Sequence, residues 1–544
     1  MSVELVLAAV AAADLCLKYG KELTQAYQAF KDASEEIKDR ILIVEAVWHR
    51  SSVQIQFARR IFRTAPEEHC RIHLDAFETL RAKLATAVNK LESVAAPFSK
   101  DSRTSIVIGR LKYAIIRNSL DAAISDLERW QRVFDPTWFL LLRIGDKLID
   151  SELTIKIVSP PKAATHSSAT APPLSTARNL RGVLSGESPE VHVSLPENGL
   201  AWETALSVPF SSTRVIQRAG SIKSFVVDTI LCDSNVNIAS ARTDAEGLAK
   251  KLKHTDPSVF GLLTCHGLVK RKDKTTGRLT SIDLIFRPPS GSSPTPGGKD
   301  SLPVSLRKRL MQPQNISLTQ AVDIARQLAS AVSFIHTCEF VHKNIRPETI
   351  LFFPDSEKPE GLGSPYMLGF DAFRNVNFQT LRKGDTAWHR NLYRHPQRQG
   401  VRANDTYVMQ HDVYSLGVCL LELGLWQSFV SYKQDGEDLG ESEQTPSEAL
   451  TQLFEEFNLN ETGVEGRLAG ASAKDELTRL AKTRLPLKLG DRYTEVVVTC
   501  LTCLDEENTD FFGQAEEDMQ DQDGVLIGTR FIEKVLMRLN EIYI

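Results

Sequence analysis

The 544-residue sequence lacks the features that mark secreted, zinc-binding and nucleic-acid-binding proteins. Its eight cysteines are scattered, and the only close pair, Cys500 and Cys503, has no second pair with which to form a zinc site. We therefore expect buried structural thiols and a reducing, intracellular compartment. The net charge of −4 is too small to favour nucleic acid as a partner.

Long apolar runs are also missing. The stretch Val3 to Leu17 is apolar, but Glu4 and Asp14 interrupt it and no Lys or Arg precedes Lys18, whereas a secretory signal begins with basic residues. About 20 apolar residues are needed to cross a bilayer. The sequence predicts a cytoplasmic protein. Any contact with a membrane would follow recruitment on activation.

Residues 1–150 show the hydrophobic period of long helices. Apolar residues recur at spacings of four and three, as in Ile37, Ile41, Val44 and Trp48, and two later segments repeat the pattern. Four such helices with short connections favour an antiparallel bundle. Its simplest role is that of a docking module.

Two features of this region allow a membrane role as an alternative. In a soluble bundle the apolar residues of the first helix would be buried, and release would offer them to lipid; these are Leu5, Leu7, Val10 and Leu15. Between Glu45 and Glu67 no acidic residue occurs, and four arginines do: Arg50, Arg59, Arg60 and Arg63. Anionic lipid attracts such charge, but the arginines can equally pair with neighbouring acids on a solvated face. The candidate membrane contacts are Leu7, Val10, Arg59, Arg60 and Arg63.

An apolar, Ala-rich first helix followed by long helices within about 150 residues resembles the HeLo and HeLo-like domains of fungal signalling and cell-death proteins. The resemblance implies a bundle whose first helix can be freed to disturb membranes, as in the HET-S type of prion-forming incompatibility protein.

Composition changes after this region. Residues 159–190 are rich in Pro, Ser, Ala, Thr and Gly and have no apolar period. We expect a flexible linker over residues 151–194 that joins domains without packing. Beyond it, strand-like runs at 224–231 and 281–287 flank a helical pattern at 241–253, which is the order of a protein-kinase small lobe.

The stretch Val341 to Phe353 resembles a protein-kinase catalytic loop. His342 stands at the His position and Arg346 at the Lys position. Asn344 replaces the Asp that accepts the substrate proton, and Thr349 replaces the Asn that holds Mg²⁺. An amide is no base, so the loop predicts a kinase fold without kinase chemistry.

Tyr366 to Phe373 matches the strand and the Asp-Phe-Gly element that follow. Phe370 takes the Phe position, Gly369 stands where the Mg²⁺-binding Asp belongs, and Asp371 lies one residue further. Further along, Asp412 begins a segment that matches the central helix of a large lobe, and we expect it to bind backbone amides of the catalytic loop.

Phosphate-binding features are missing. No Gly-x-Gly-x-x-Gly occurs, and the strand that should carry the nucleotide-binding Lys reads Val226-Val227-Asp228-Thr229. Lys223 at the start of that strand is a weak nucleotide candidate, with Glu246 as its partner in the helix. An exposed helix carboxylate is the other interpretation of Glu246.

Together these patterns predict a multidomain protein with an all-α N-terminal helical bundle at 1–150 and an α+β bilobal protein-kinase-like fold, its degenerate small lobe at 195–290 and its large lobe at 291–544. The arrangement resembles fungal HeLo-kinase proteins and the mixed-lineage kinase domain-like executioner of necroptosis. That resemblance implies a pseudokinase that regulates the bundle, with protein partners, an anionic membrane surface and self-association, and with no cofactor or metal. The alternatives are an atypical active Ser/Thr kinase using ATP and Mg²⁺, and a soluble adaptor without membrane action.

Overall fold

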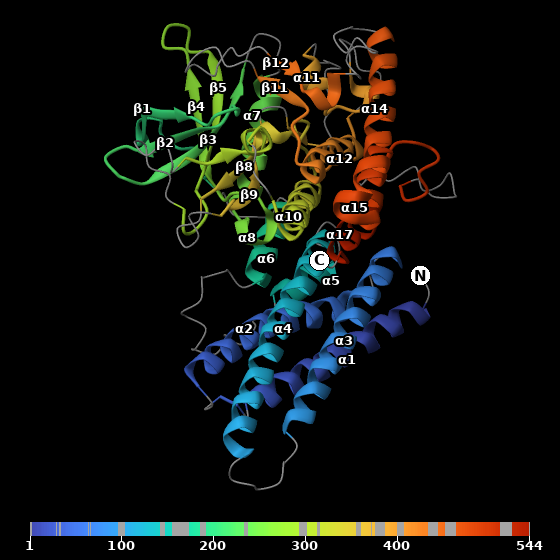
Figure 1. Cartoon of the computed structure of the whole chain (residues 1–544). Helices are drawn as coiled ribbons and strands as arrows, with labels where there is room; N and C mark the ends of the chain where they lie inside the picture. Colours follow the sequence, from blue (N-terminus) through green and yellow to red (C-terminus); the bar gives the residue numbers. More distant parts are fainter. Residues whose placement is uncertain are drawn as a thin grey trace. The chain divides into compact units, whose positions relative to one another are not determined.

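The computed structural model divides the chain into two compact units, Met1–Gly186 and Glu187–Ile544 (Figure 1). The residues described are 3–28, 30–31, 34–63, 65, 67–95, 104–141, 147–154, 173–184, 192–232, 238–292, 302–312, 316–354, 361–370, 373–375, 387–399, 407–432, 444–451, 464–511 and 525–542.

The first unit is helical. Its long helices are α1 (Val3–Gln28), α2 (Glu35–Ile61), α3 (Glu67–Ala95) and α4 (Thr104–Leu141). Helix α1 packs on α2 and α3, and α4 packs on the same two helices. The predicted period is confirmed, because Ile37, Ile41, Val44 and Trp48 are all buried. Ser34 caps α2 by accepting a hydrogen bond from the Ile37 amide.

The buried face of α1 differs from the expected one. Leu7 is 63% exposed and Leu15 is 38% exposed, so the prediction that both are buried is wrong. Small residues face the neighbouring helices instead: Ala9, Ala12, Ala13, Cys16 and Gly20. The approach is close, since a Cβ at Gly20 would lie 2.0 Å from the Trp48 ring. Small side chains let α1 lie near α2, and Val6, Leu23 and Tyr27 are the larger residues on the buried face.

The expected linker contains a packed helix. Helix α6 (Pro173–Leu184) contacts α2 and the short helix α5 (Lys147–Thr154), and its residues Ala177 and Leu180 are buried. Arg181 Nε lies 2.7 Å from Asp150 Oδ1, and Arg178 Nε donates to the Leu153 carbonyl. This corrects the expectation that nothing between residues 159 and 190 packs, and the boundary between units lies at Gly186 instead of Asp150.

The second unit begins with a five-stranded antiparallel sheet. Its strands are β1 (Leu200–Ser207), β2 (Arg214–Arg218), β3 (Ser224–Leu231), β4 (Cys265–Lys272) and β5 (Leu279–Phe286). They are ordered β1-β2-β3-β5-β4. Short turns join β1 to β2, β2 to β3 and β4 to β5, and helix α7 (Ile238–Leu252) follows β3 and packs on β4 and β5. Helix α8 (Pro257–Phe260) precedes β4, and a 3₁₀ turn, η2 (Glu197–Gly199), precedes β1.

The rest of this unit is mostly helical and surrounds helix α12 (Met409–Leu425), in which every residue except Gln410 is buried. Helices α10 (Leu318–Thr337) and α15 (Pro486–Leu501) pack on it. The other helices and turns are α9 (Leu306–Leu310), η4 (Pro347–Thr349), α11 (Trp388–Asn391), η5 (Pro396–Arg398), η6 (Glu448–Leu450), α14 (Val464–Arg484), α16 (Val525–Phe531), the π-helical η8 (Ile532–Met537) and α17 (Arg538–Asn540).

Short strands complete the unit. Strands β6 (Val304–Ser305), β8 (Ile350–Phe353) and β9 (Ser364–Met367) form one antiparallel sheet. Strand β7 (Phe340–Val341) pairs with β10 (Arg374–Asn375), and β11 (Val430–Tyr432) pairs with β12 (Gln444–Pro446). The loop that carries the candidate site runs from β7 to β8, beside the end of β9.

The eight cysteines, all of which are described, are buried and form no disulfide. Within the described ranges, no helix has both the length and the apolar character needed to cross a membrane.

Candidate functional site

The loop between β7 and β8 is anchored by one carboxylate. Asp412, fully buried at the start of α12, accepts hydrogen bonds from the amides of His342 (2.7 Å) and Lys343 (2.9 Å), and from the Tyr407 hydroxyl. Burial alone would raise the pKa of Asp412, but hydrogen bonding to His336 and other neighbours lowers it. This is the contact with the loop that the sequence led us to expect for Asp412.

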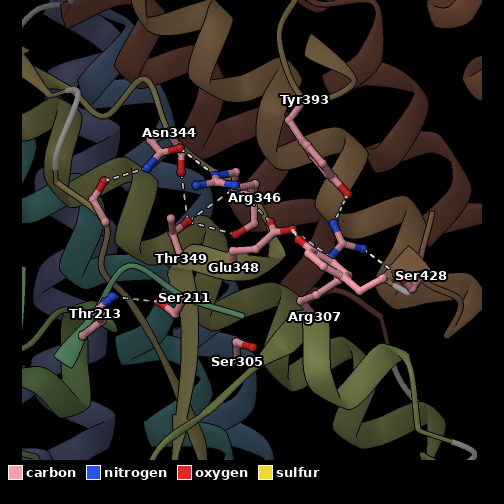
Figure 2. A network of polar contacts seen from close by, with 12 residues as sticks. Ser211, Thr213, Ser305, Arg307, Asn344, Arg346, Glu348, Thr349, Tyr393 and Ser428 are labelled. Atoms are coloured by element: carbon pink, nitrogen blue, oxygen red, sulfur yellow. Dashed lines mark hydrogen bonds and ion pairs between the residues drawn. The ribbon is translucent and has the colours of Figure 1, made fainter. Parts of the chain in front are cut away.

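Asn344 and Thr349 are engaged within the loop itself. Asn344 Nδ2 donates to the Gly369 carbonyl (3.2 Å), and its Oδ1 accepts from Arg346 Nε (2.8 Å). Thr349 Oγ1 accepts from the Arg346 amide and lies 2.9 Å from the Asn344 carbonyl (Figure 2). The positions matched to a base and a metal ligand therefore form internal hydrogen bonds that fix the shape of the loop.

Gly369 allows a close backbone approach. Its φ is +84°, and a Cβ there would lie 2.3 Å from Thr349 Cγ2, so the loop leaves no space for a side chain. Phe370 is buried, and its ring centroid lies 4.8 Å from that of His342 and 6.0 Å from that of Phe286. Asp371, the third candidate in this segment, lies outside the described residues.

A further carboxylate, to which we assigned no role from the sequence, meets this segment. Asp228 on β3 is 1% exposed, and its Oδ2 accepts from the amides of Gly369 (2.6 Å) and Phe370 (3.3 Å). Its Oδ1 accepts from Thr213 Oγ1 (2.8 Å). The signal for this role was present, because a charged residue inside an apolar strand must find a partner when it is buried.

Lys223 and Glu246 are not brought together. Lys223 lies exposed in the turn between β2 and β3. Glu246 on α7 instead binds Lys270 Nζ of β4 (2.5 Å) and Arg242 Nε (3.0 Å). Burial alone would raise the pKa of Glu246, but the hydrogen bonds from Lys270 and Arg242 lower it. The pairing proposed from the sequence is thus replaced by one with Lys270, which we did not predict.

Next to the loop lies a buried charge network centred on Arg307 of α9 (Figure 2). Its Nε donates to Glu348 (2.9 Å), its Nη1 to Glu422 (2.8 Å), and its Nη2 to the Tyr393 hydroxyl (2.5 Å). Burial alone would raise the pKa of Glu348, but the Arg307 guanidinium outweighs it and the pKa falls to about 2. Burial raises the pKa of Glu422. Because Glu348 belongs to η4 at the end of the loop, the network connects the loop to α9 and α12.

In the helical unit, most of the candidate arginines are paired with acids. Arg59 Nε lies 2.9 Å from Asp14, and Arg60 pairs with Glu152. Arg50 pairs with Asp135 (2.7 Å), and Arg63 is exposed. Of the apolar candidates, Leu7 is exposed and Val10 is half-buried. The arrangement agrees with the second interpretation of these arginines, in which acids neutralise them.

Among the described residues, no group of three or more His, Cys, Asp or Glu side chains is placed to hold a metal ion. No protein-family model matches the chain, and no curated protein matches it. A functional assignment has to come from the geometry described above.

Proposed function

We propose that the α+β unit is a catalytically deficient protein-kinase-like domain that acts in signalling as a scaffold or switch. The order of its elements supports this: a five-stranded sheet with helix α7 and the short helix α8 between β3 and β4, then a helical part with the loop before β8. On this proposal residues 195–290 form the small lobe and 291–544 the large lobe.

The observation that carries the proposal is the contact of Asp228 with Gly369. The resemblance places a Lys on this strand, where its charge would attract nucleotide phosphates. A buried carboxylate has the opposite charge, and two like charges about 4 Å apart repel by several kcal/mol in the low-dielectric environment of a protein. Asp228 also occupies the amides that begin the segment after β9. Phosphoryl transfer depends on positioning and charge stabilisation, and these residues supply neither.

The test is to incubate the full-length protein with labelled ATP, Mg²⁺ or Mn²⁺ and generic protein substrates, and to measure thermal unfolding with and without nucleotide. We expect no incorporation and no rise in the unfolding temperature, since only a bound ligand stabilises the folded state. If labelled phosphate is incorporated and Asn344→Ala abolishes the incorporation, the proposal is refuted. The alternative, an active kinase with ATP and Mg²⁺ as cofactors, is then established.

A second candidate function, membrane contact by the helical unit, is favoured by a row of exposed residues on α1. Val3 is 72% exposed, Leu7 63% and Leu15 38%, and Ala11 between them is exposed as well. Their spacing of four puts them on one face of the helix. The ion pairs of Arg50, Arg59 and Arg60 weaken attraction to anionic lipid, so apolar burial would have to supply the affinity.

This candidate is tested by dye leakage from anionic and neutral vesicles, with the full chain and with residues 1–186. We expect residues 1–186 to cause leakage and the full chain to cause less. The fragment that carries both Val3→Glu and Leu7→Glu should cause none. Leu42→Glu, at an exposed position of α2, is the matched control and should leave leakage unchanged. Vesicles that stay intact with a folded helical unit would make a soluble adaptor the better account.

A further inference from the structure

A cationic cluster lies at one end of the five-stranded sheet and consists of Arg218, Lys253, His266 and Arg287. The pairing of β4 with β5 shifts register between Cys265 and Gly267, so His266 is the extra residue of a β-bulge. Its ring stacks on Phe225 of β3, with centroids 4.9 Å apart and planes 8° apart. The bulge and this contact fix the orientation of the imidazole.

The hydrogen bond between Arg287 and His266 defines which ring nitrogen carries the proton. Arg287 Nη2 lies 3.2 Å from His266 Nδ1. A guanidinium can only donate, so Nδ1 accepts and the neutral ring is protonated on Nε2. Within the described ranges Nε2 has no hydrogen-bond partner, and it is not among the buried polar atoms that lack one. His266 therefore offers an accessible N–H donor.

Arg218 at the end of β2 reaches the same face of the sheet. Ile216, two residues earlier, is the register partner of Phe225 in β3, and alternate residues of a strand point to one side. Arg218 and Phe225 are therefore diagonal neighbours, and Arg218 is exposed.

Lys253, just after α7, completes the cluster. Its Nζ donates to the His192 carbonyl (3.1 Å). The chain that follows His192 runs parallel to β4, with a bridge between Ser194 and Leu268. By the same register His192 lies alongside His266, and this places the Lys253 ammonium group close to the imidazole.

No acid neutralises the cluster in the part of the chain that the structure describes. Arg218, Lys253 and Arg287 form no ion pair there. Burial lowers the pKa of His266, and the positive charges of these three residues lower it further, since like charges disfavour protonation. An anion placed among them would meet three permanent positive charges and the Nε2–H of His266.

The number of charges selects the anion. A carboxylate carries one negative charge, whereas a phosphate monoester carries about −1.5 to −2 at pH 7 and has three strong acceptor oxygens. Clusters of basic side chains are a common way to recognise phosphorylated residues. Ile222, in the adjoining turn between β2 and β3, is 88% exposed. It offers an apolar contact to a polypeptide that carries the phosphate.

We propose that the cationic cluster binds a phosphorylated serine or threonine of a partner protein, and that an apolar side chain of the same segment covers Ile222. Arg218, Arg287 and Lys253 pair with the phosphate oxygens, and His266 Nε2–H donates to one of them. The site does not depend on whether the α+β unit binds nucleotide.

The experiment passes two libraries of short peptides over the immobilised full-length protein. Both have random flanks; one has a central phosphoserine and the other a central aspartate. One variant is Arg218→Gln with Arg287→Gln. The matched control, Arg278→Gln, removes an exposed arginine from the turn between β4 and β5.

We expect the wild type and Arg278→Gln to retain phosphoserine peptides and to enrich those with apolar flanking residues. The double variant should retain about tenfold less, because charge-assisted hydrogen bonds are lost. Equal retention of the two libraries by the wild type, or undiminished retention by the double variant, would overturn the proposal.

Free phosphate and acids of the same chain are the other occupants to be tested. Glu187 and Glu190 precede His192 in the sequence and lie outside the described residues. If they filled the site, Glu187→Gln with Glu190→Gln would bind the selected phosphopeptide more tightly than the wild type does. We expect equal affinities. Tighter binding by this variant, or binding of inorganic phosphate as tight as that of the peptide, would refute docking of a partner.

His266 reports the ligand directly. Nuclear magnetic resonance of ring-labelled histidine follows its titration, and His266→Gln identifies its signal among the 12 histidines. The selected phosphopeptide should raise the pKa of His266 by about one unit or more, because a phosphate beside Nε2 stabilises the charged ring. A pKa that the peptide leaves unchanged would show that His266 only packs against Phe225 and would refute its contact with the phosphate. Far-ultraviolet circular dichroism confirms that each variant folds.

Discussion

The Asp228 carboxylate lies 2.6 Å from the amide nitrogen of Gly369, although 141 residues separate them in sequence. A hydrogen bond from a backbone amide to a buried charge is stronger than one between neutral groups. Asp228 is held on β3 within the five-stranded sheet, whereas Gly369 follows β9 in the helical part. The contact thus joins the sheet to the helical part of the α+β unit.

Replacing Asp228 by alanine is expected to destabilise the α+β unit by about 3 kcal/mol, because two amides and the Thr213 hydroxyl lose their acceptor inside the protein. Asp228→Asn should cost only about 1 kcal/mol, since its amide oxygen still accepts from Gly369. Urea denaturation measures both. Glu203→Ala, at an exposed position on β1, is the control and should change the free energy of unfolding little. Equal losses of stability for Asp228→Asn and Asp228→Ala would show that the hydrogen bond from the Gly369 amide is not what stabilises the fold.

Arg307→Ala is expected to cost about 3 to 5 kcal/mol, because it leaves Glu348 and Glu422 buried without their cation. Adding Glu348→Gln and Glu422→Gln to the same chain should restore part of the loss, since neutral side chains need no counter-charge. The neighbouring Lys308→Ala, which removes a cation outside this network, serves as the control. Denaturant titrations of the single and triple variants measure these changes in the free energy of unfolding. A triple variant less stable than Arg307→Ala would contradict this account of the network.

Hydrophobic periodicity predicted the buried face of α2 correctly. Apolar residues at spacings of three and four specify which face of α2 is buried, because any helix brings such residues onto one side. The anchor at Asp412 could also be expected, since its position relative to the loop at His342 follows from a motif. These features depend on local spacing.

Sequence patterns predicted contacts less well where small or polar residues make them. On α1 the middle of the buried face, from Ala9 to Gly20, consists of Ala, Cys and Gly. Hydrophobicity alone does not show that the close approach of α1 to α2 outweighs the burial of Leu7. The partner of Asp228 lies 141 residues away and is a backbone amide, which carries no side-chain signal. Lys270 was overlooked as the partner of Glu246 because the pairing depends on how α7 crosses the sheet.

Helix α6 is expected to resist trypsin in the native protein, although Arg178 and Arg181 are cleavage sites. Both arginines are held to α5, and Leu180 is buried; cleavage requires local unfolding. Leu180→Asp places a charge in that contact and should speed cutting at both arginines at least tenfold. Asn179→Asp adds the same charge on the exposed side of α6 and should have little effect. Mass spectrometry of timed digests identifies the cuts, and rapid cutting of the wild type at these two sites would show that the helix does not pack.

Two stacked histidines of α3 predict how the stability of the helical unit depends on pH. His69 and His73 are buried, with ring centroids 6.4 Å apart, and His73 packs against the rings of Phe62, Phe77 and Phe134. Burial lowers the pKa of His69 to about 3 and that of His73 to about 4. Both ring nitrogens of His69 lack a partner among the described residues.

The sign follows from linkage. A histidine in the unfolded chain takes up a proton near pH 6.5, whereas these two stay neutral in the folded protein until pH 4 or below. The unfolded state therefore binds more protons between these values, and stability is lost as the pH falls. Each histidine contributes about 1.4 kcal/mol per pH unit, so the pair contributes about 2.7 kcal/mol. Above pH 6.5 the effect vanishes.

Urea denaturation of residues 1–186 from pH 7.5 to 4.5 measures this slope. The fragment is used because His395 and His411 of the other unit also have pKa values lowered by burial. The range ends at pH 4.5 because hydrogen bonding to Tyr113 lowers the pKa of Glu36, and most of the stability that this carboxylate contributes is lost below that pH. His69→Leu should halve the slope without losing a hydrogen bond of that ring, whereas His49→Gln on α2 should leave it unchanged. A slope that is the same in His69→Leu as in the wild type would mean that another group makes the helical unit sensitive to acid.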